Sequence, residues 1–154
     1  MVTLGSGSAT GALLEVVELR HKRRESVFAQ LVAAAEQAGV VREPEVLMAA
    51  LVRGQKLGPS SIGRGFAVPH ARSVAVLKPS LMFGRSRRGI DWCAEDAEPV
   101  QLVLLVLSPS VFAPAAHAER VAAAAHALRL QRMRHKLLEA AGDAVRALLA
   151  EVPE

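Results

Sequence analysis

The sequence predicts a single α/β domain of two or three layers, in which helices cover a β-sheet. Three observations lead to this fold class. The length of 154 residues fits one ordinary domain that folds without disulfides or metal ions. The segment 101–107 is apolar on both faces, which is typical of a strand in the centre of a covered sheet. Helical patterns precede and follow this strand-rich middle, and no internal repeat is visible.

The N-terminal part of the chain begins with a polar stretch. Residues 1–11 are rich in Gly, Ser and Thr, so we expect a flexible tail there and a folded domain over 12–154. Residues 12–18 interleave apolar and acidic side chains, a pattern that favours a strand. The run Arg20–Arg24 is expected to be a basic, solvent-exposed turn.

Two helices are expected next. Ser26 is predicted to be the N-cap of a helix over 27–38, where apolar residues recur at helical spacing. A second helix over 44–54 begins with Pro44, because a missing N–H costs nothing in the first turn. The Gly- and Ser-rich segment 57–65 that follows cannot be the interior of a helix.

Short strands alternate with turns in the middle of the chain. We expect strands at 66–68, 80–84 and 100–107, and an edge strand or turn at 89–92. Arg85–Arg88 is predicted to be a basic turn that faces solvent or docks an acidic partner.

The C-terminal third is predicted to be helical. The expected helices cover 114–130 and 133–140, and Asp143 is expected to cap a last helix that ends near 152.

Composition excludes several classes of protein. The apolar runs are far shorter than the ~20 residues that cross a bilayer, so we expect no membrane insertion. The N-terminus has no secretory pattern, and a single cysteine rules out an internal disulfide, so we expect a cytoplasmic protein. The net charge is +4 and the pI is near 10.0. Aromatics make up only 3% of the chain and tyrosine is absent, which argues against a nucleic-acid partner that needs base stacking.

The segment 60–72 carries the strongest functional signal. A glycine-bearing turn leads into a short apolar strand that stops at Pro69, and His70 follows at once. An imidazole at a rigid strand end is a candidate catalytic or ligand-binding group, although the residues alone leave a purely structural histidine open. Gly63-Arg64-Gly65 is no nucleotide loop, because it precedes a strand and lacks the Lys-Ser/Thr ending.

Residues 57–72, which read LGPSSIGRGFAVPHAR, resemble an active-site signature that runs roughly L-G-S-T-G-I-G-x-G-I-A-I-P-H-x-R. This signature is typical of the enzyme IIA components of the bacterial phosphotransferase system, in the fructose, mannitol and nitrogen-regulatory family. The resemblance continues through 89–92, 98–109 and 117–128, and covers about residues 12–150. It implies a mixed β-sheet of about five strands flanked by helices on both faces.

The resemblance also implies a phosphohistidine relay. His70 would accept a phosphoryl group from a histidine-containing phosphocarrier protein and pass it to a IIB domain or a regulatory protein. His117, 47 residues later, matches the family's second active-site histidine, and Ser60 stands where the family has a hydroxyl-bearing Thr. Neither a cofactor nor a metal ion is needed for this chemistry.

One departure from the family pattern concerns a cation. The family usually has Arg-Glu just before the loop, whereas this chain has Gly54 and Gln55. Arg53, Arg64 and Arg72 are therefore candidate phosphoryl-stabilising residues.

Three functions are compared. The first is a phosphotransferase, and the nitrogen-regulatory type is favoured over the sugar-specific type because no permease domain is attached. The second is a regulatory binding module of the same fold whose phosphorylation is impaired by Gly54. The third, a nucleic-acid binder, rests only on the basic pI.

Two further histidines and the cysteine are expected to have no role in catalysis or metal binding. His126 and His135 are predicted to lie on helix surfaces, and their spacing from His117 suits no metal site. Cys93 is interpreted as a small apolar residue.

Overall fold

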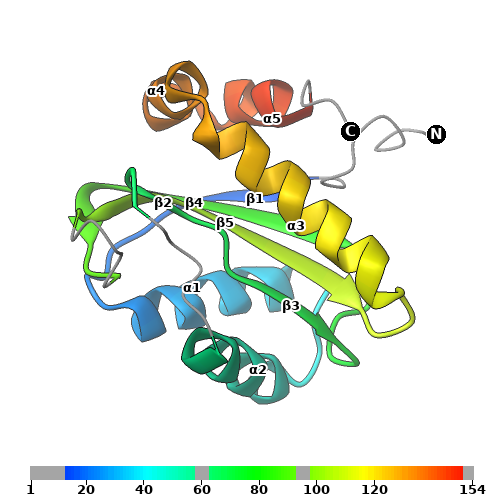
Figure 1. The fold of residues 1–154 in the computed structure, drawn as a ribbon. Helices are drawn as coiled ribbons and strands as arrows, with labels where there is room; N and C mark the ends of the chain where they lie inside the picture. Colours follow the sequence, from blue (N-terminus) through cyan, green and yellow to red (C-terminus); the bar gives the residue numbers. More distant parts are fainter. Residues whose placement is uncertain (1–12, 58–62, 93–97, 151–154) are drawn as a thin grey trace.

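The chain folds into a mixed five-stranded β-sheet with helices on both faces (Figure 1), which confirms the predicted fold class. The computed structural model describes residues 13–57, 63–92 and 98–150. The predicted tail, Ser60 and Cys93 therefore lie outside the described residues. In chain order, the elements are β1 (Leu13–Glu18), α1 (Arg24–Gln37), α2 (Pro44–Leu57), β2 (Phe66–Ala67), β3 (His70–Ser73), β4 (Ser80–Ile90), β5 (Val100–Pro109), α3 (Pro114–Arg129), α4 (Gln131–Glu139) and α5 (Gly142–Ala150).

The sheet has the order β1-β4-β5, and the two short strands β2 and β3 follow one another along the free side of β5. β1 is parallel to β4, β4 is antiparallel to β5, and both short strands are parallel to β5. Strand β5 is thus bonded on both sides, as its continuous apolar sequence predicts.

The side chains of β5 alternate between two separate cores. Val103, Leu105 and Leu107 belong to the core under α1 and α2. The residues between them, Leu104 and Val106 among others, belong to the core under α3, α4 and α5. Figure 1 shows these two helical layers on opposite faces of the sheet. Each fully buried Leu or Val contributes roughly 1.5–3 kcal/mol, so this strand alone explains much of the layered arrangement.

The strand predicted at 66–68 is present as the two-residue β2, and a further short strand follows it, so His70 is the first residue of β3 rather than a residue beyond a strand end. Pro69 lies in the gap and has no N–H to give to the ladder. Its carbonyl oxygen still accepts a hydrogen bond of 3.0 Å from the Val106 N–H, which keeps the chain against β5. The proline therefore positions His70 at a defined point along β5.

The predicted basic turn at Arg85–Arg88 is wrong, because β4 continues through these residues to Ile90. Arg85 is buried and its Nε donates to the Glu18 carboxylate at 2.7 Å. Its guanidinium also donates to the carbonyl oxygen of Leu137 at 2.8 Å, in the last turn of α4. A cation is favoured at a helix C-terminus. These contacts of Arg85 allow a charged residue to be buried inside a strand.

Three helix boundaries also differ from the prediction. Helix α1 begins at Arg24, so Ser26 lies in its first turn and is not its N-cap. Helix α2 runs past Gly54 to Leu57, since a single exposed glycine costs only about 1 kcal/mol in a helix. Asp143 is the second residue of α5 and pairs with Arg146 at 3.1 Å instead of capping the helix. In the last two cases a local signal in the sequence does not decide the structure: the glycine does not end α2, and the aspartate forms an ion pair instead of a cap.

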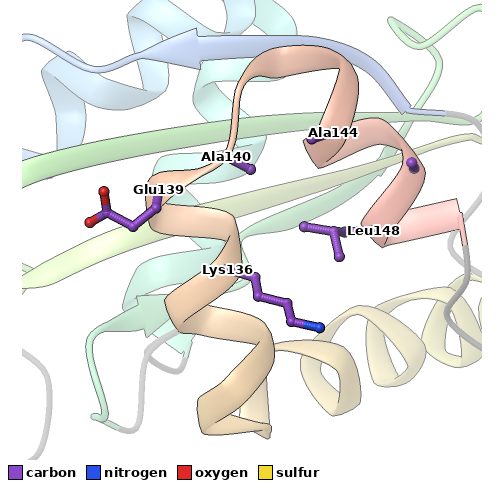
Figure 2. A pocket seen from close by; sticks show the side chains of 6 residues that line it. Lys136, Glu139, Ala140, Ala144 and Leu148 are labelled. Carbon is purple, nitrogen blue, oxygen red and sulfur yellow. The ribbon is translucent and has the colours of Figure 1, made fainter.

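An open hollow of about 410 Å³ lies between α4 and α5 (Figure 2). Its wall consists largely of alanine and leucine side chains, with Lys136 and Glu139 at its edge. In the described part of the chain, no helix combines the length and the apolar character that crossing a membrane requires.

Candidate functional site

Two histidines that are 47 residues apart in the sequence meet in the structure. His70 Nδ1 lies 3.0 Å from His117 Nε2, which is hydrogen-bonding distance. The ring centroids are 5.1 Å apart and the ring planes are inclined by 50°. His70 is exposed, whereas His117 is only 8% exposed. The pair therefore consists of an accessible ring and a buried ring that supports it.

The fold brings each histidine to this point by a different route. His70 opens β3 and pairs with Val106 of β5. His117 lies in the first turn of α3, after β5 has ended and the chain has turned back over the sheet. The N-terminal turn of a helix has free N–H groups and a partial positive charge, so this location suits an anionic group. The predicted place of His117 at a helix start is confirmed.

Ser108 and Arg120 form a buried hydrogen-bond network with His117. Ser108 Oγ lies 2.7 Å from His117 Nδ1, and an Arg120 N–H donates to the same oxygen at 2.6 Å. Arg120 also donates to the carbonyl oxygen of Leu107 at 2.7 Å. All three side chains are buried, and buried polar groups that bond to each other hold one another in fixed orientations.

The surroundings keep both histidines neutral at physiological pH. Burial and, to a smaller extent, the charges of the nearby His70, Arg120 and Arg72 together lower the pKa of His117 to about 4. The protein around one side of His70 removes water from it and lowers its pKa below 6.5. Burial lowers the pKa of Arg120 to about 10, so this guanidinium remains charged at neutral pH. The site therefore combines neutral imidazoles with nearby positive charge.

Arg72 ties β3 to the turn that precedes α3. Its guanidinium donates to the carbonyl oxygens of Ser110 at 2.8 Å and Phe112 at 3.2 Å. Arg72 is exposed and lowers the pKa of His117 through its charge. Of the three candidate cations, Arg72 is the one whose charge reaches the histidine pair.

The other predicted site residues lie elsewhere or outside the described residues. Arg53 is exposed on α2, and no hydrogen bond joins it to either histidine in the part of the chain that the structure describes. Arg64 adopts a positive φ of 65° and lies close enough to Arg134 to lower the pKa of that guanidinium. Ser60 falls in the undescribed segment 58–62, so its place remains a prediction.

Sequence reasoning missed Ser108 and Arg120. A signal for Arg120 existed, because it stands three residues after His117 and four before Ala124, on the apolar side of an amphipathic helix. A basic residue on that side must be buried and bonded. Ser108 gave a weaker signal, as the first polar residue at the end of the apolar β5 strand.

Two arrangements of protons satisfy this chain of hydrogen bonds. In one, His117 donates from Nδ1 to Ser108 and accepts from His70 Nδ1, so the far nitrogen of His70, Nε2, keeps a free electron pair. In the other, both bonds of His117 reverse and His70 Nε2 carries the hydrogen, while Arg120 still donates to Ser108. Since each histidine is neutral, it has one donor and one acceptor nitrogen in either case.

The described residues contain no group of three or more His, Cys, Asp or Glu side chains with a metal-binding arrangement. His126 and His135 are exposed on α3 and α4, which confirms their predicted surface positions.

The lowered pKa of His117 predicts a loss of stability in weak acid. The unfolded chain binds a proton near pH 6.5 and the folded chain only near pH 4, so the unfolded state gains protons first as the pH falls. We expect the free energy of unfolding to drop by about 2 kcal/mol from this residue between pH 7 and pH 4.5. Urea unfolding followed by circular dichroism across this range measures the effect.

The matched control for this experiment is an exposed histidine. We expect His117→Asn to flatten the dependence between pH 7 and pH 4.5, and His126→Asn to leave the wild-type curve unchanged. Equal pH dependence in wild type and His117→Asn would show that His117 titrates normally and is not held neutral.

Comparison with known proteins places this chain in a family. Residues 13–151 match the family described as "Phosphoenolpyruvate-dependent sugar phosphotransferase system, EIIA 2". The fructose-specific EIIA component of Haloferax volcanii is 33% identical over 144 residues, which cover 92% of this chain and 93% of that protein. The nitrogen regulatory protein of Bradyrhizobium diazoefficiens is 33% identical over 130 residues, which cover 84% of this chain and 82% of that protein.

One larger protein and two solved structures are also similar to this chain. The fructose-specific EIIABC component of Bacillus subtilis is 28% identical over 127 residues, and the chain spans only 20% of that protein. The crystal structure of nitrogen regulatory protein IIA-Ntr from Neisseria meningitidis superposes with a TM-score of 0.80 at 25% identity, over 89% of this chain and 95% of that one. The IIA mannitol structure from Escherichia coli shares the fold, with a TM-score of 0.72 at 23% identity, over 88% of this chain and 94% of that one.

Proposed function

Because the chain belongs to the EIIA 2 family of the phosphoenolpyruvate-dependent sugar phosphotransferase system, we propose that it accepts a phosphoryl group on His70 and passes it on. The observation that carries this proposal is the direct contact between an exposed His70 and a buried, neutral His117. A neutral imidazole is a good nucleophile at pH 7, and exposure gives a partner's phosphohistidine access to it.

The transfer uses the nitrogen of His70 that points away from His117. His70 Nδ1 is engaged with His117, so the Nε2 electron pair attacks phosphorus. The new N–P bond forms while the N–P bond of the donor breaks, and the electrons of that bond stay on the donor's imidazole nitrogen. This step requires the proton arrangement in which His70 carries its hydrogen on Nδ1 and His117 accepts it.

His117 stabilises the charge that this step creates. Attack by Nε2 makes the His70 ring more positive, and the hydrogen on Nδ1 then forms a stronger bond to a neutral acceptor. His117 remains such an acceptor because its pKa of about 4 prevents protonation. Ser108, which accepts from His117 Nδ1–H in this arrangement, holds the acceptor nitrogen toward His70.

Positive charge beside the pair suits the three phosphoryl oxygens. Arg72 and Arg120 both act on His117 through their charges, and the first turn of α3 adds free N–H groups. Since phosphoryl transfer passes through a loose transition state, positioning and charge stabilisation account for most of the catalysis. No step in this scheme depends on a metal ion or a cofactor.

The partners follow from the same chemistry. The donor would be a histidine-containing phosphocarrier protein, and the receiver a IIB domain or a regulatory target in the cytoplasm. We propose the nitrogen-regulatory type over the sugar-specific type; the IIA-Ntr and IIA mannitol structures share the fold, which does not separate the two types. Relatives named for fructose and for nitrogen regulation are equally similar in sequence, so the receiver must be tested directly.

A reconstituted relay tests the proposal. The full chain is incubated with phosphoenolpyruvate, the general phosphotransferase enzyme and the carrier protein, and its intact mass is followed over time. We expect a gain of one phosphoryl group on the peptide that contains His70, stable in base and lost in acid. No gain while the carrier itself becomes phosphorylated would overturn the proposal, and so would a phosphoryl group on another residue.

Restoring the family's arginine tests the alternative of impaired phosphorylation. Gly54 is exposed on α2, and a Cβ atom added there meets nothing within 4 Å. We expect Gly54→Arg to raise the free energy of unfolding by about 0.5–1 kcal/mol, because arginine is a far better helix former than glycine. We also expect faster phosphoryl acceptance, since a cation returns to the helix that packs on β3.

Gly54→Ala is the matched control for this change. Alanine gives a similar gain in helix stability without a charge. Both variants should therefore unfold at higher urea concentrations, and only Gly54→Arg should change the transfer rate. Identical rates in the two variants would show that position 54 has no part in holding the phosphoryl group.

A further inference from the structure

A second hollow, of about 270 Å³, lies at the far end of the sheet from the histidine pair. We call it the basic hollow. It is lined by the segment 19–22 after β1 and by residues 86, 88 and 89 of β4. Leu102, which pairs with Arg85 of β4, and Ser108, which contacts His117, are six residues apart on β5. At ~3.3 Å per residue this separation is about 20 Å, so the basic hollow is not part of the histidine site.

The base of the hollow is buried and includes a hydroxyl group. Leu19, Ser86 and Gly89 are all buried. Ser86 Oγ accepts a hydrogen bond of 3.1 Å from the Gly89 N–H. No acceptor in the described part of the chain takes the hydrogen of this hydroxyl, which is therefore available to a ligand.

The walls of the hollow are basic. Arg20, His21, Lys22 and Arg88 line it, and all four are exposed. Arginine and lysine side chains are hydrogen-bond donors only, and the protonated form of histidine is a donor at both nitrogens. Together with the serine hydroxyl, these side chains form a lining of donors with at least three positive charges.

These cations differ from the two other arginines in the last part of β4. Arg85 is paired with Glu18 at 2.7 Å, and Arg87 is paired with Glu139 at 3.0 Å. By contrast, no carboxylate of residues 13–57, 63–92 or 98–150 lies within ion-pair distance of Arg20, Lys22 or Arg88. The charge of the hollow is therefore not neutralised inside the described part of the molecule.

Hydrogen bonds at both ends of the segment 19–22 hold the basic hollow in shape. The Leu19 N–H donates to the carbonyl oxygen of Arg85 at 2.8 Å, and the Asp91 N–H donates to that of Lys22 at 2.9 Å. The Arg20 N–H donates to the Gln30 side chain at 3.3 Å. A ligand would thus enter a site that is already formed, which lowers the entropic cost of binding.

We propose that the basic hollow binds a small anion that carries phosphate groups. Guanidinium groups match phosphate oxygens in pairs, and the positive charges of the walls favour an anion over a neutral ligand. The volume is just below the ~300–1,000 Å³ typical of small-molecule sites, which favours a compact ligand over a large one. A concave site with a buried base suits such an anion better than the flat surface of an acidic protein.

Titration with inorganic pyrophosphate tests this proposal. The amide signals of the full-length protein are followed by ¹H–¹⁵N NMR at constant ionic strength. We expect saturable shifts at residues 19–22 and 86–89, and smaller shifts elsewhere. Shifts that grow without saturation, or that are largest around His70, would overturn the proposal. The experiment needs no phosphoryl transfer, so its result is independent of the function proposed for His70.

Three matched variants identify the residues that bind. Arg88→Ala and Lys22→Ala each remove one exposed wall cation, and each should weaken binding about tenfold or more. Arg42→Ala removes an equally exposed arginine near the opposite end of the sheet, where its N–H bonds to Ala75, and should change the affinity less than twofold. If all three variants lose affinity equally, binding depends only on the overall charge of the protein, and the proposed site is wrong.

A peptide of ten glutamates distinguishes an acidic protein partner from a small phosphate compound. We expect pyrophosphate to saturate the amides of the hollow at lower concentration than the peptide does. The reverse order, with the same amides moving, would replace the proposed ligand by an acidic segment of a partner protein and overturn the proposal.

Discussion

His70→Ala is expected to accept no phosphoryl group under conditions that fully phosphorylate the wild-type chain. The methyl group that remains has no nucleophilic atom, and His117 cannot take over. His117 is only 8% exposed, which leaves little access for a large protein donor. Intact mass after incubation with the phosphorylated carrier measures the loss.

The same variant should remain folded, which makes the loss of phosphorylation interpretable. His70 is exposed, and an exposed side chain changes stability by about 0.5 kcal/mol or less when it is replaced. Its hydrogen bond to His117 is lost, but Ser108 still contacts the other nitrogen of that ring. Unfolding in urea and the circular dichroism spectrum at neutral pH should therefore match the wild type closely.

His126→Ala is the control for a lost imidazole. His126 is exposed on α3, nine residues after His117, and is expected to be phosphorylated neither in the wild type nor in any variant. This variant should gain one phosphoryl group at the wild-type rate. Phosphorylation of His70→Ala, or its loss in His126→Ala, would contradict the assignment of the acceptor.

The layered fold was predictable from the sequence because its strongest signals are local. The apolar residues of β5 alternate between two cores, and a strand that must be covered on both sides requires helices on both faces. The C-terminal helices showed their pattern in the same direct way, and α3 begins and ends within one residue of the prediction. Each of these features follows from neighbouring residues alone.

The extent of β4 was not predictable, because it depends on distant partners. Three arginines between residues 85 and 88 look like a solvated turn when they are considered alone. In the structure, Arg85 reaches a carboxylate 67 residues earlier in the chain and a helix end 52 residues later. A charged residue in a strand becomes acceptable only when such long-range partners are present.

The site was predictable in part. The resemblance and the motif around His70 named both histidines, and the structure places their nitrogens 3.0 Å apart. The support by Ser108 and Arg120 arises where the end of β5 meets the first turns of α3, so it depends on how two elements pack. Position 120 falls where the family pattern specifies no residue, and the resemblance alone therefore offered no reason to single it out.

His117→Ala should still accept a phosphoryl group on His70, but roughly 10²–10³-fold more slowly, as expected when one stabilising hydrogen-bond partner is removed from a transition state. The positive charge that develops on His70 would lose its neutral acceptor, and the His70 ring would be free to rotate. Rapid-quench measurement of the first turnover with excess phosphorylated carrier gives the rate. A rate equal to the wild type in a folded His117→Ala protein would remove His117 from the mechanism.

Ser108→Ala separates the orientation of His117 from its presence. This change keeps the imidazole in place and deletes only the hydroxyl that lies 2.7 Å from its Nδ1. Without the hydroxyl, no acceptor holds a hydrogen on His117 Nδ1, so the form with hydrogen on Nε2, which cannot accept from His70, becomes more populated. We expect a loss of about tenfold, together with a change in the ¹⁵N shifts of His117 that reports the mixed forms. A slower rate with unchanged ¹⁵N shifts would assign the effect to packing, because a change in the nitrogen that carries the hydrogen must alter these shifts.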